Sequence, residues 1–223
     1  MIRIDISVSF CEAITVVSKK MQKRFHMVNS NPSQETAQTP KAKRTRASIL
    51  VAARYLVGTE GINGVTVMAV CQRAGIGRTS FYNYFADVPA LLRAIVDETA
   101  QTVQAQFEAL HGEQPRGLAR LERCLQMVLQ LAASDPELGL VLTALADHYP
   151  ETTDLLREQI RLELSAAREM GDLLCPQEAC AAPADFLTTT TLAVARDLAA
   201  GRLDAALDET YTGYLMQSIG AKR

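Results

Sequence analysis

The chain has 223 residues, of which 48% are hydrophobic, 22% charged and 5% aromatic. This length fits one large domain or two small ones, and the composition excludes a wholly disordered or collagen-like chain. We expect no transmembrane helix, because no apolar run reaches about 18 residues, and no secretory signal, because charges interrupt the apolar start. The five cysteines are few and odd in number, which favours a reducing cytoplasm over a disulfide framework.

The charge is unevenly distributed along the chain. Residues 41–93 carry eight Lys and Arg against two Asp and Glu, whereas residues 94–223 carry ten against twenty. A basic segment joined to an acidic body predicts a small module that binds a polyanion. Uneven surface charge without a partner is the alternative.

The first forty residues predict an extension and a linker. Residues 29–40, NSNPSQETAQTP, are polar, contain two prolines and lack apolar periodicity, so we expect a disordered linker. Residues 1–26 have two open interpretations: an over-called start or disordered arm, or a functional basic arm. The arm would use Lys19, Lys20, Lys23 and Arg24.

Helical patterning begins at Lys41 and predicts a helix-turn-helix domain over residues 41–88. A first helix with Ile49 and Leu56 facing inward is expected to stop at Gly58 and Gly61. Thr66 is a suitable N-cap for a short second helix, and Gly75-Ile76-Gly77 is a tight turn. A second short helix over residues 78–85 completes the arrangement.

The remainder, residues 89–223, predicts further helices and no strands, so the expected fold is all-α. Breaks at glycines and prolines divide it. The expected helices lie near 89–110, 116–133, 136–147, 151–172, 184–200 and 203–218.

Residues 44–92 read RTRASILVAARYLVGTEGINGVTVMAVCQRAGIGRTSFYNYFADVPALL. The informative positions are Gly61, Val65-Thr66-Val67, Ala74-Gly75-Ile76, Phe81-Tyr82, Tyr84-Phe85 and Leu91-Leu92. With these residues at this spacing, the stretch resembles the TetR/AcrR family of bacterial transcriptional regulators. The resemblance covers about a fifth of the chain. The rest agrees with that family in length and helical character only.

The short helix over residues 78–85 predicts a DNA-reading face. Phe81 and Phe85 lie four residues apart and are expected to be buried, which leaves a polar face that fits a major groove. Thr66, at a helix N-terminus, can offer its hydroxyl and backbone amides to a phosphate. The resemblance adds Tyr84 as a phosphate contact, with Arg44 and Arg46 where an N-terminal extension meets DNA. The polar face comprises Arg78, Thr79, Tyr82 and Asn83, flanked by Ser80 and Tyr84.

Each contact has a simpler alternative. Tyr82 could pack on the domain surface, Arg78 could contact phosphate instead of a base, and Thr66 could only cap its helix. The family often has Lys at the positions held here by Ala86 and Val88, so we expect weaker non-specific affinity with a flatter salt dependence.

Enzyme chemistry has no support in the sequence. The three histidines, His26, His111 and His148, show no metal-binding spacing, and Cys175 and Cys180 lack CxxC spacing. Phosphate-binding and nucleophile motifs are also missing. We therefore expect no enzymatic activity, no metal and no cofactor.

The resemblance implies that the C-terminal helices form a homodimer and enclose a small-molecule pocket. The last two helices would supply the dimer interface through Leu192, Leu207, Tyr211 and Tyr214. The middle helices would line the pocket with Phe107, Cys124, Met127, Leu145, Tyr149 and Met170. Both sets could equally be ordinary core.

The predicted function is a sequence-specific regulator of transcription. We expect a repressor, bound as a homodimer to a near-palindromic double-stranded DNA operator and released by a small apolar or amphipathic ligand. It would be bacterial and cytoplasmic, associated with the nucleoid when bound to its operator, and without a membrane partner. The alternatives are a DNA-binding regulator switched by a protein partner, and a helical enzyme or scaffold with a coincidental N-terminal module.

Overall fold

The computed structural model describes residues 39–113, 115–146, 148–173 and 181–219. Within these ranges the chain is helical and contains no β-strand, so the expected all-α fold is confirmed. The contacts divide the chain into two units, Met1–Lys43 and Arg44–Arg223. Of the first unit only residues 39–43 are described, and these begin a helix in which the Lys43 N–H donates to the Thr39 carbonyl at 3.0 Å. The expected disordered extension over residues 1–40 lies almost entirely outside the described residues.

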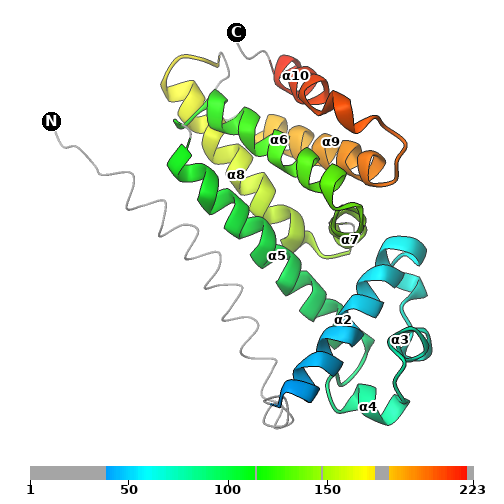
Figure 1. Cartoon of the computed structure of the whole chain (residues 1–223). Coiled ribbons are helices and arrows are strands. Elements are labelled where there is room, and N and C mark those ends of the chain that lie inside the picture. Colours follow the sequence, from blue (N-terminus) through cyan, green and yellow to red (C-terminus); the bar gives the residue numbers. More distant parts are fainter. Residues whose placement is uncertain (1–38, 114, 147, 174–180, 220–223) are drawn as a thin grey trace, which may run out of the picture. The chain divides into compact units, whose positions relative to one another are not determined.

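Figure 1 shows the elements in chain order. They are α2 (Pro40–Glu60), η2 (Ile62–Gly64), α3 (Val67–Ala74), α4 (Arg78–Tyr82), α5 (Val88–Glu113), α6 (Leu118–Ser134), α7 (Pro136–Ala146), α8 (Pro150–Glu169), α9 (Ala181–Ala199), η4 (Ala205–Leu207) and α10 (Asp208–Ser218).

A first hydrophobic core, which we call the N-terminal core, lies among α2, α3, α4 and the first part of α5. Ile49, Phe81 and Leu91 from these helices are fully buried in it. Val141 and Leu145 of α7 also belong to it, although α7 is remote in the sequence. The helix-turn-helix segment therefore shares its core with a helix from the rest of the chain.

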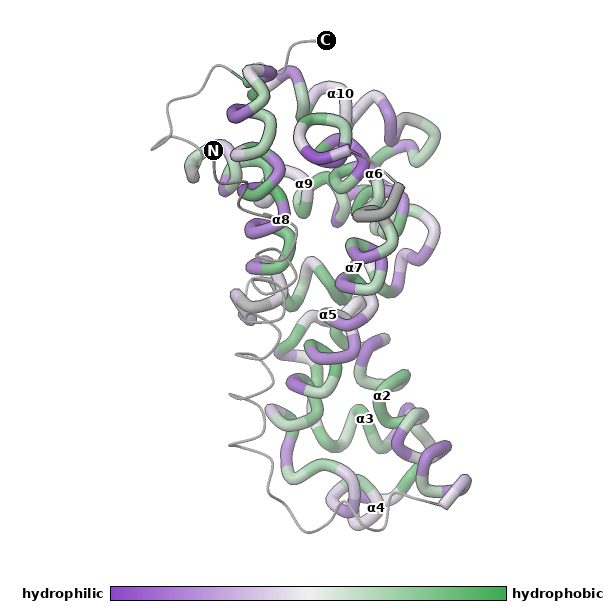
Figure 2. Tube along the Cα trace, turned by 90° about the vertical axis from the view of Figure 1, so that its left-hand side faces the viewer, coloured by the Kyte–Doolittle hydropathy of each residue, from purple (hydrophilic) through white to green (hydrophobic). Residues whose placement is uncertain are grey.

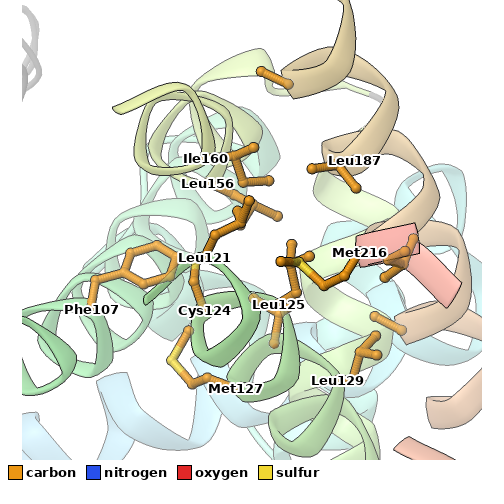
Figure 3. Packing of buried hydrophobic residues seen from close by; sticks show 14 of the residues in the cluster. Phe107, Leu121, Cys124, Leu125, Met127, Leu129, Leu156, Ile160, Leu187 and Met216 are labelled. Carbon is orange, nitrogen blue, oxygen red and sulfur yellow. The ribbon is translucent and has the colours of Figure 1, made fainter. Parts of the chain in front are cut away.

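A second core, the C-terminal core, is organised around α6, which contacts α5, α7, α8, α9 and α10. In Figure 3 the α6 residues Leu121 and Leu125 gather in one cluster with Ile160 of α8 and Leu187 of α9, and all four are fully buried. Figure 2 shows hydrophobic and hydrophilic residues recurring in turn along the helices. This pattern is expected where each helix turns one face to a core.

Several helix boundaries differ by three or more residues from those predicted. Helix α2 continues through Gly58 and ends at Glu60, immediately before Gly61, so of the two predicted stops only Gly61 ends the helix. A glycine inside a helix costs only about 1 kcal/mol, so Gly58 does not end the helix by itself. Helix α4 ends at Tyr82 instead of residue 85. Helix α10 begins at Asp208 instead of near 203, because the Asp204 carboxylate caps the preceding 3-10 turn by accepting the Ala206 N–H at 2.9 Å.

No single helix among the described residues is both long and apolar enough to cross a membrane. Helices α6 and α7 together pass the length and composition test, but the chain turns by 118° between them.

Candidate nucleic-acid interface

Helices α3 and α4 are set at a fixed angle by a capped turn. Helix α3 begins at Thr66, whose hydroxyl accepts the Ala69 N–H at 3.1 Å, so the expected N-cap is confirmed. It ends at Gly75, which has φ +65° and ψ +35°, and the Ile76 N–H returns to the Cys71 carbonyl at 3.0 Å. This left-handed C-cap is the device that commonly terminates helices at glycine. The next helix, α4, then starts at Arg78.

Two phenylalanines anchor the short helix α4. Phe81 is fully buried and Phe85 is 6% exposed, with their ring centroids 6.0 Å apart. The prediction that both would be buried is confirmed. Because α4 has only five residues, it depends on this anchoring rather than on its own hydrogen bonds for its position.

The opposite face of α4 presents the residues predicted to read DNA. Tyr82 is 49% exposed, and Ser80 and Tyr84 are half-buried at the edges of the face. Side chains of these types can donate or accept hydrogen bonds, and arginine and asparagine can each form two hydrogen bonds with one base edge. The exposed members of this face are Arg78, Thr79, Tyr82 and Asn83.

The three other predicted DNA contacts lie in different surroundings. Thr66 and Arg44 are exposed. Arg46 is half-buried and contacts two groups: its Nη1 lies 3.4 Å from Oε1 of Glu98, and its guanidinium carbon lies 5.4 Å from the Phe85 ring centroid. Sequence reasoning missed this arrangement because Glu98 is 52 residues away and no local spacing indicates the pair.

A groove between α2 and α3 was not predicted from the sequence. It has a volume of about 710 Å³, and beside it the Arg73 guanidinium stacks 3.1 Å from the centroid of the Tyr55 ring. The two walls come from helices separated in the sequence, so periodicity alone could not place them together. The lining residues are Ser48, Val51, Ala52, Arg73 and Ala74.

The six residues predicted to line a pocket do not lie together. Phe107, Cys124 and Met127 belong to the C-terminal core, where Phe107 points toward α6 in Figure 3. Leu145 is buried in the N-terminal core and Tyr149 packs against it. Met170 is 55% exposed. Leu145 differs from the prediction because α7 is apolar on more than one side, and periodicity cannot tell which core each side meets.

A buried ionic network, not predicted from the sequence, joins α6 to α8. The Glu163 side chain is fully buried and accepts the Gly117 N–H at 2.8 Å and a Gln159 amide N–H at 3.0 Å. Arg120 Nη1 lies 3.6 Å from Glu163 Oε1. Burial, and then the charge of Glu163, raises the pKa of the Cys124 thiol far above its ordinary value. The thiol therefore stays protonated and unreactive.

The predicted dimer residues are also divided. Leu192 and Tyr211 are half-buried against the C-terminal core, whereas Tyr214 is 65% exposed. The Leu207 side chain lies outside the described residues. Among those described, no group of three or more His, Cys, Asp or Glu side chains is placed to hold a metal ion.

Residues 49–95 match the family model described as "Bacterial regulatory proteins, tetR family". The matched segment runs from the middle of α2, through α3 and α4, into α5. It contains the capped turn and the exposed α4 face.

Two curated relatives match parts of the chain at less than 30% identity. The chain is 28% identical over 149 residues to a bifunctional uridylyltransferase/uridylyl-removing enzyme of Ruegeria pomeroyi, covering 66% of this chain and 14% of that protein. It is 24% identical over 123 residues to the nucleoid occlusion factor SlmA of Haemophilus influenzae, covering 54% of this chain and 56% of that protein. The chain therefore spans a small part of the first relative and about half of the second.

Solved structures resemble the fold over most of the chain. The fatty acid degradation regulator FadR from Bacillus halodurans superposes with a TM-score of 0.66 at 17% identity, covering 83% of this chain and 99% of that one. The ketosteroid transcriptional regulator KstR2 of Mycobacterium tuberculosis gives 0.63 at 15% identity, covering 80% and 95%. A gamma-butyrolactone receptor gives 0.63 at 21% identity, covering 81% and 100%. At these identities the likeness establishes the fold.

Proposed function

Residues 49–95 are a helix-turn-helix domain of the TetR family of bacterial regulatory proteins, and from this premise we propose that the chain is an operator-binding repressor released by a small ligand. DNA-binding regulation of transcription is the function of that family. The repressor mechanism and the ligand are the parts proposed for this chain.

The observation that carries the proposal is the polar face of α4. Three exposed side chains of α4 and the exposed side chain of Asn83, its C-cap, can hydrogen-bond to base edges, and the helix is held from behind by the buried Phe81 and Phe85. A helix fixed in this way can enter a major groove without a large ordering cost. Thr66 and Arg44 are exposed and available to phosphates, whereas Arg46 is already engaged by Glu98.

A dimer follows from the size of the reading helix. One helix of five residues reads only a few base pairs, so a specific site needs two copies. A two-fold dimer places the second copy about 34 Å away, one turn along the duplex. The expected operator is therefore nearly palindromic.

A small ligand is supported by the fold relatives. The names of three similar structures refer to a fatty acid degradation regulator, a ketosteroid regulator and a gamma-butyrolactone receptor. We propose that this chain takes a small apolar or amphipathic ligand in its C-terminal core, near Phe107, Cys124 and Met127. The uridylyltransferase match does not support an enzyme, because it spans 14% of that protein.

The proposal is tested by selecting bound duplexes from a random library with the full chain, then measuring the affinity for the selected site. We expect a two-fold symmetric site, and Asn83→Ala weakens binding to it by roughly 5- to 150-fold, the equivalent of about 1–3 kcal/mol for one lost base contact. Asn63→Ala is the control, because Asn63 is exposed in the same domain but lies on η2. Weak, salt-sensitive binding without a consensus site contradicts the proposal.

A further inference from the structure

Glu98 on α5 holds two arginines of α2 at once. Its Oε1 lies 3.4 Å from Nη1 of Arg46, and its Oε2 lies 3.3 Å from Nη1 of Arg54. The arginines are eight residues apart, which is about 12 Å along a helix, so one carboxylate spans two turns of α2. Each carboxylate oxygen therefore has its own cationic donor.

The position of Glu98 along α5 is distinctive. The buried residues of α5 up to Val96 belong to the N-terminal core, and those from Val103 onward belong to the C-terminal core. Glu98 lies where α5 passes from one core to the other. The network also extends to α7, because Arg54 Nε lies 3.9 Å from Oε1 of Glu137.

Arg46 links this network to the DNA-reading helix. Its guanidinium lies 5.4 Å from the centroid of the Phe85 ring, and Phe85 packs against Phe81 of α4. Cation–π contacts of this kind are directional, because the cation is attracted to the face of the ring. The continuous path is therefore Glu137, Arg54, Glu98, Arg46 and Phe85, ending behind α4.

We propose that Glu98 and Arg46 are positioning residues for DNA recognition: Glu98 fixes the Arg46 guanidinium over Phe85, and Arg46 thereby sets the position of α4 in the groove. This inference rests on the proposed operator binding. It assigns Arg46 a role through Phe85 in place of a phosphate contact, and it assigns Glu98 a role in specificity although Glu98 does not touch DNA.

Glu98→Gln distinguishes the proposal from simple charge repulsion, because the two predict opposite changes in affinity for the selected operator. If Glu98 only repels DNA, its neutralisation tightens binding to every sequence. If it positions α4, its neutralisation weakens binding to the selected operator, by about 3- to 10-fold, and leaves binding to unrelated DNA unchanged or slightly tighter. Glu60→Gln is the matched control, since it removes the same charge from an exposed site on α2.

Arg46→Gln provides the second measurement, through the salt dependence of operator binding. A phosphate contact removed by this change lowers the slope of log K against log salt by about one. We expect the slope to stay at the wild-type value while the preference for the operator over unrelated DNA falls 3- to 10-fold, by roughly the same factor as in Glu98→Gln. The double variant is then no worse than either single variant, because both act through one contact.

The outcomes separate this inference from the proposed function. If the wild-type chain selects no site, operator binding itself is wrong. If the wild type selects a site and Glu98→Gln binds it as tightly as Glu60→Gln, or if Arg46→Gln lowers the salt slope by one, only the positioning role is wrong. Helical circular dichroism and the melting temperature of each variant establish that a loss of specificity is measured on folded protein.

Discussion

At the scale of single residues, removal of the buried Glu163 carboxylate is expected to destabilise the C-terminal core. Glu163→Ala removes a fully buried carboxylate that lies 3.6 Å from Nη1 of Arg120 and accepts the Gly117 N–H. We expect this change to lower the free energy of unfolding by about 3–5 kcal/mol, measured by urea denaturation. Glu163→Gln keeps an acceptor for the Gly117 N–H and should cost less.

Glu158→Gln is the matched control on the same helix. Glu158 pairs with Arg161 three residues away, and both side chains are partly exposed to solvent. Such a surface pair contributes little, so the control should change stability by no more than about 0.5 kcal/mol. Equal effects of Glu163→Ala and Glu158→Gln would show that the buried network is not a source of stability.

The exposure of the α4 face opposite Phe81 and Phe85 could be predicted from the sequence because the pattern is local. Phe81 and Phe85 lie one helical turn apart, and burying them determines which neighbours face outward. The partners of Arg46 and Glu163 could not be predicted, because Glu98 and Arg120 are brought to them by helix packing. No periodicity within one helix records a contact of that kind.

At the scale of elements, the turn between α3 and α4 offers a test with a matched pair of glycines. Gly75 has φ +65° and Gly77 has φ −79°, and a β-carbon on either would meet no atom within 4 Å. The two sites therefore differ in backbone conformation and not in available space. Gly75→Ala should destabilise the chain by about 1–2 kcal/mol, because an L-residue is strained in the left-handed region.

Gly77→Ala should cost less than Gly75→Ala, because Gly77 has an ordinary φ and the change costs only the preference of an N-cap position for glycine over alanine. Thermal unfolding followed by circular dichroism measures both variants. Equal melting temperatures for the two would mean that the left-handed cap is not what holds the turn. Loss of operator binding in Gly75→Ala alone would add that the angle between α3 and α4 matters for recognition.

Helix ends show what sequence can and cannot specify at this scale. The start of α3 was predictable because Thr66 caps it with its own side chain. The end of α2 at Glu60 was also predictable, because Gly61 follows it with φ +72°. Gly58 is a false stop, because one glycine inside a helix costs only about 1 kcal/mol and the helix continues through it.

At the scale of the whole molecule, α7 explains why the helical class was predictable but the cores were not. The all-α fold follows from helical periodicity along the chain. However, α7 contributes Val141 and Leu145 to the N-terminal core and Leu142 to the C-terminal core. The division of one apolar helix between two cores depends on three-dimensional packing. Helical periodicity therefore cannot show that Leu145 and Tyr149 lie at a different core from Phe107.

The proposed homodimer is a property of the whole molecule, and an exposed aromatic residue of α10 offers a test of it. Tyr214 on α10 is 65% exposed, whereas Leu192 and Tyr211 are half-buried against their own core. Of the predicted interface residues whose side chains the structure describes, Tyr214 is thus the most exposed. Aromatic residues in this position often dominate the binding energy of an interface.

Tyr214→Glu should therefore convert the dimer to a monomer at micromolar concentration, because a charge at the centre of an apolar interface is desolvated without a partner. Sedimentation velocity measures the change, with Met170→Glu as the control, since Met170 is 55% exposed but lies outside α9 and α10. Operator affinity should fall with the dimer, because one reading helix alone contacts too few base pairs. A Tyr214→Glu chain that stays dimeric would place the interface elsewhere. A monomeric chain that still binds the operator at full affinity would contradict the two-fold mode of reading.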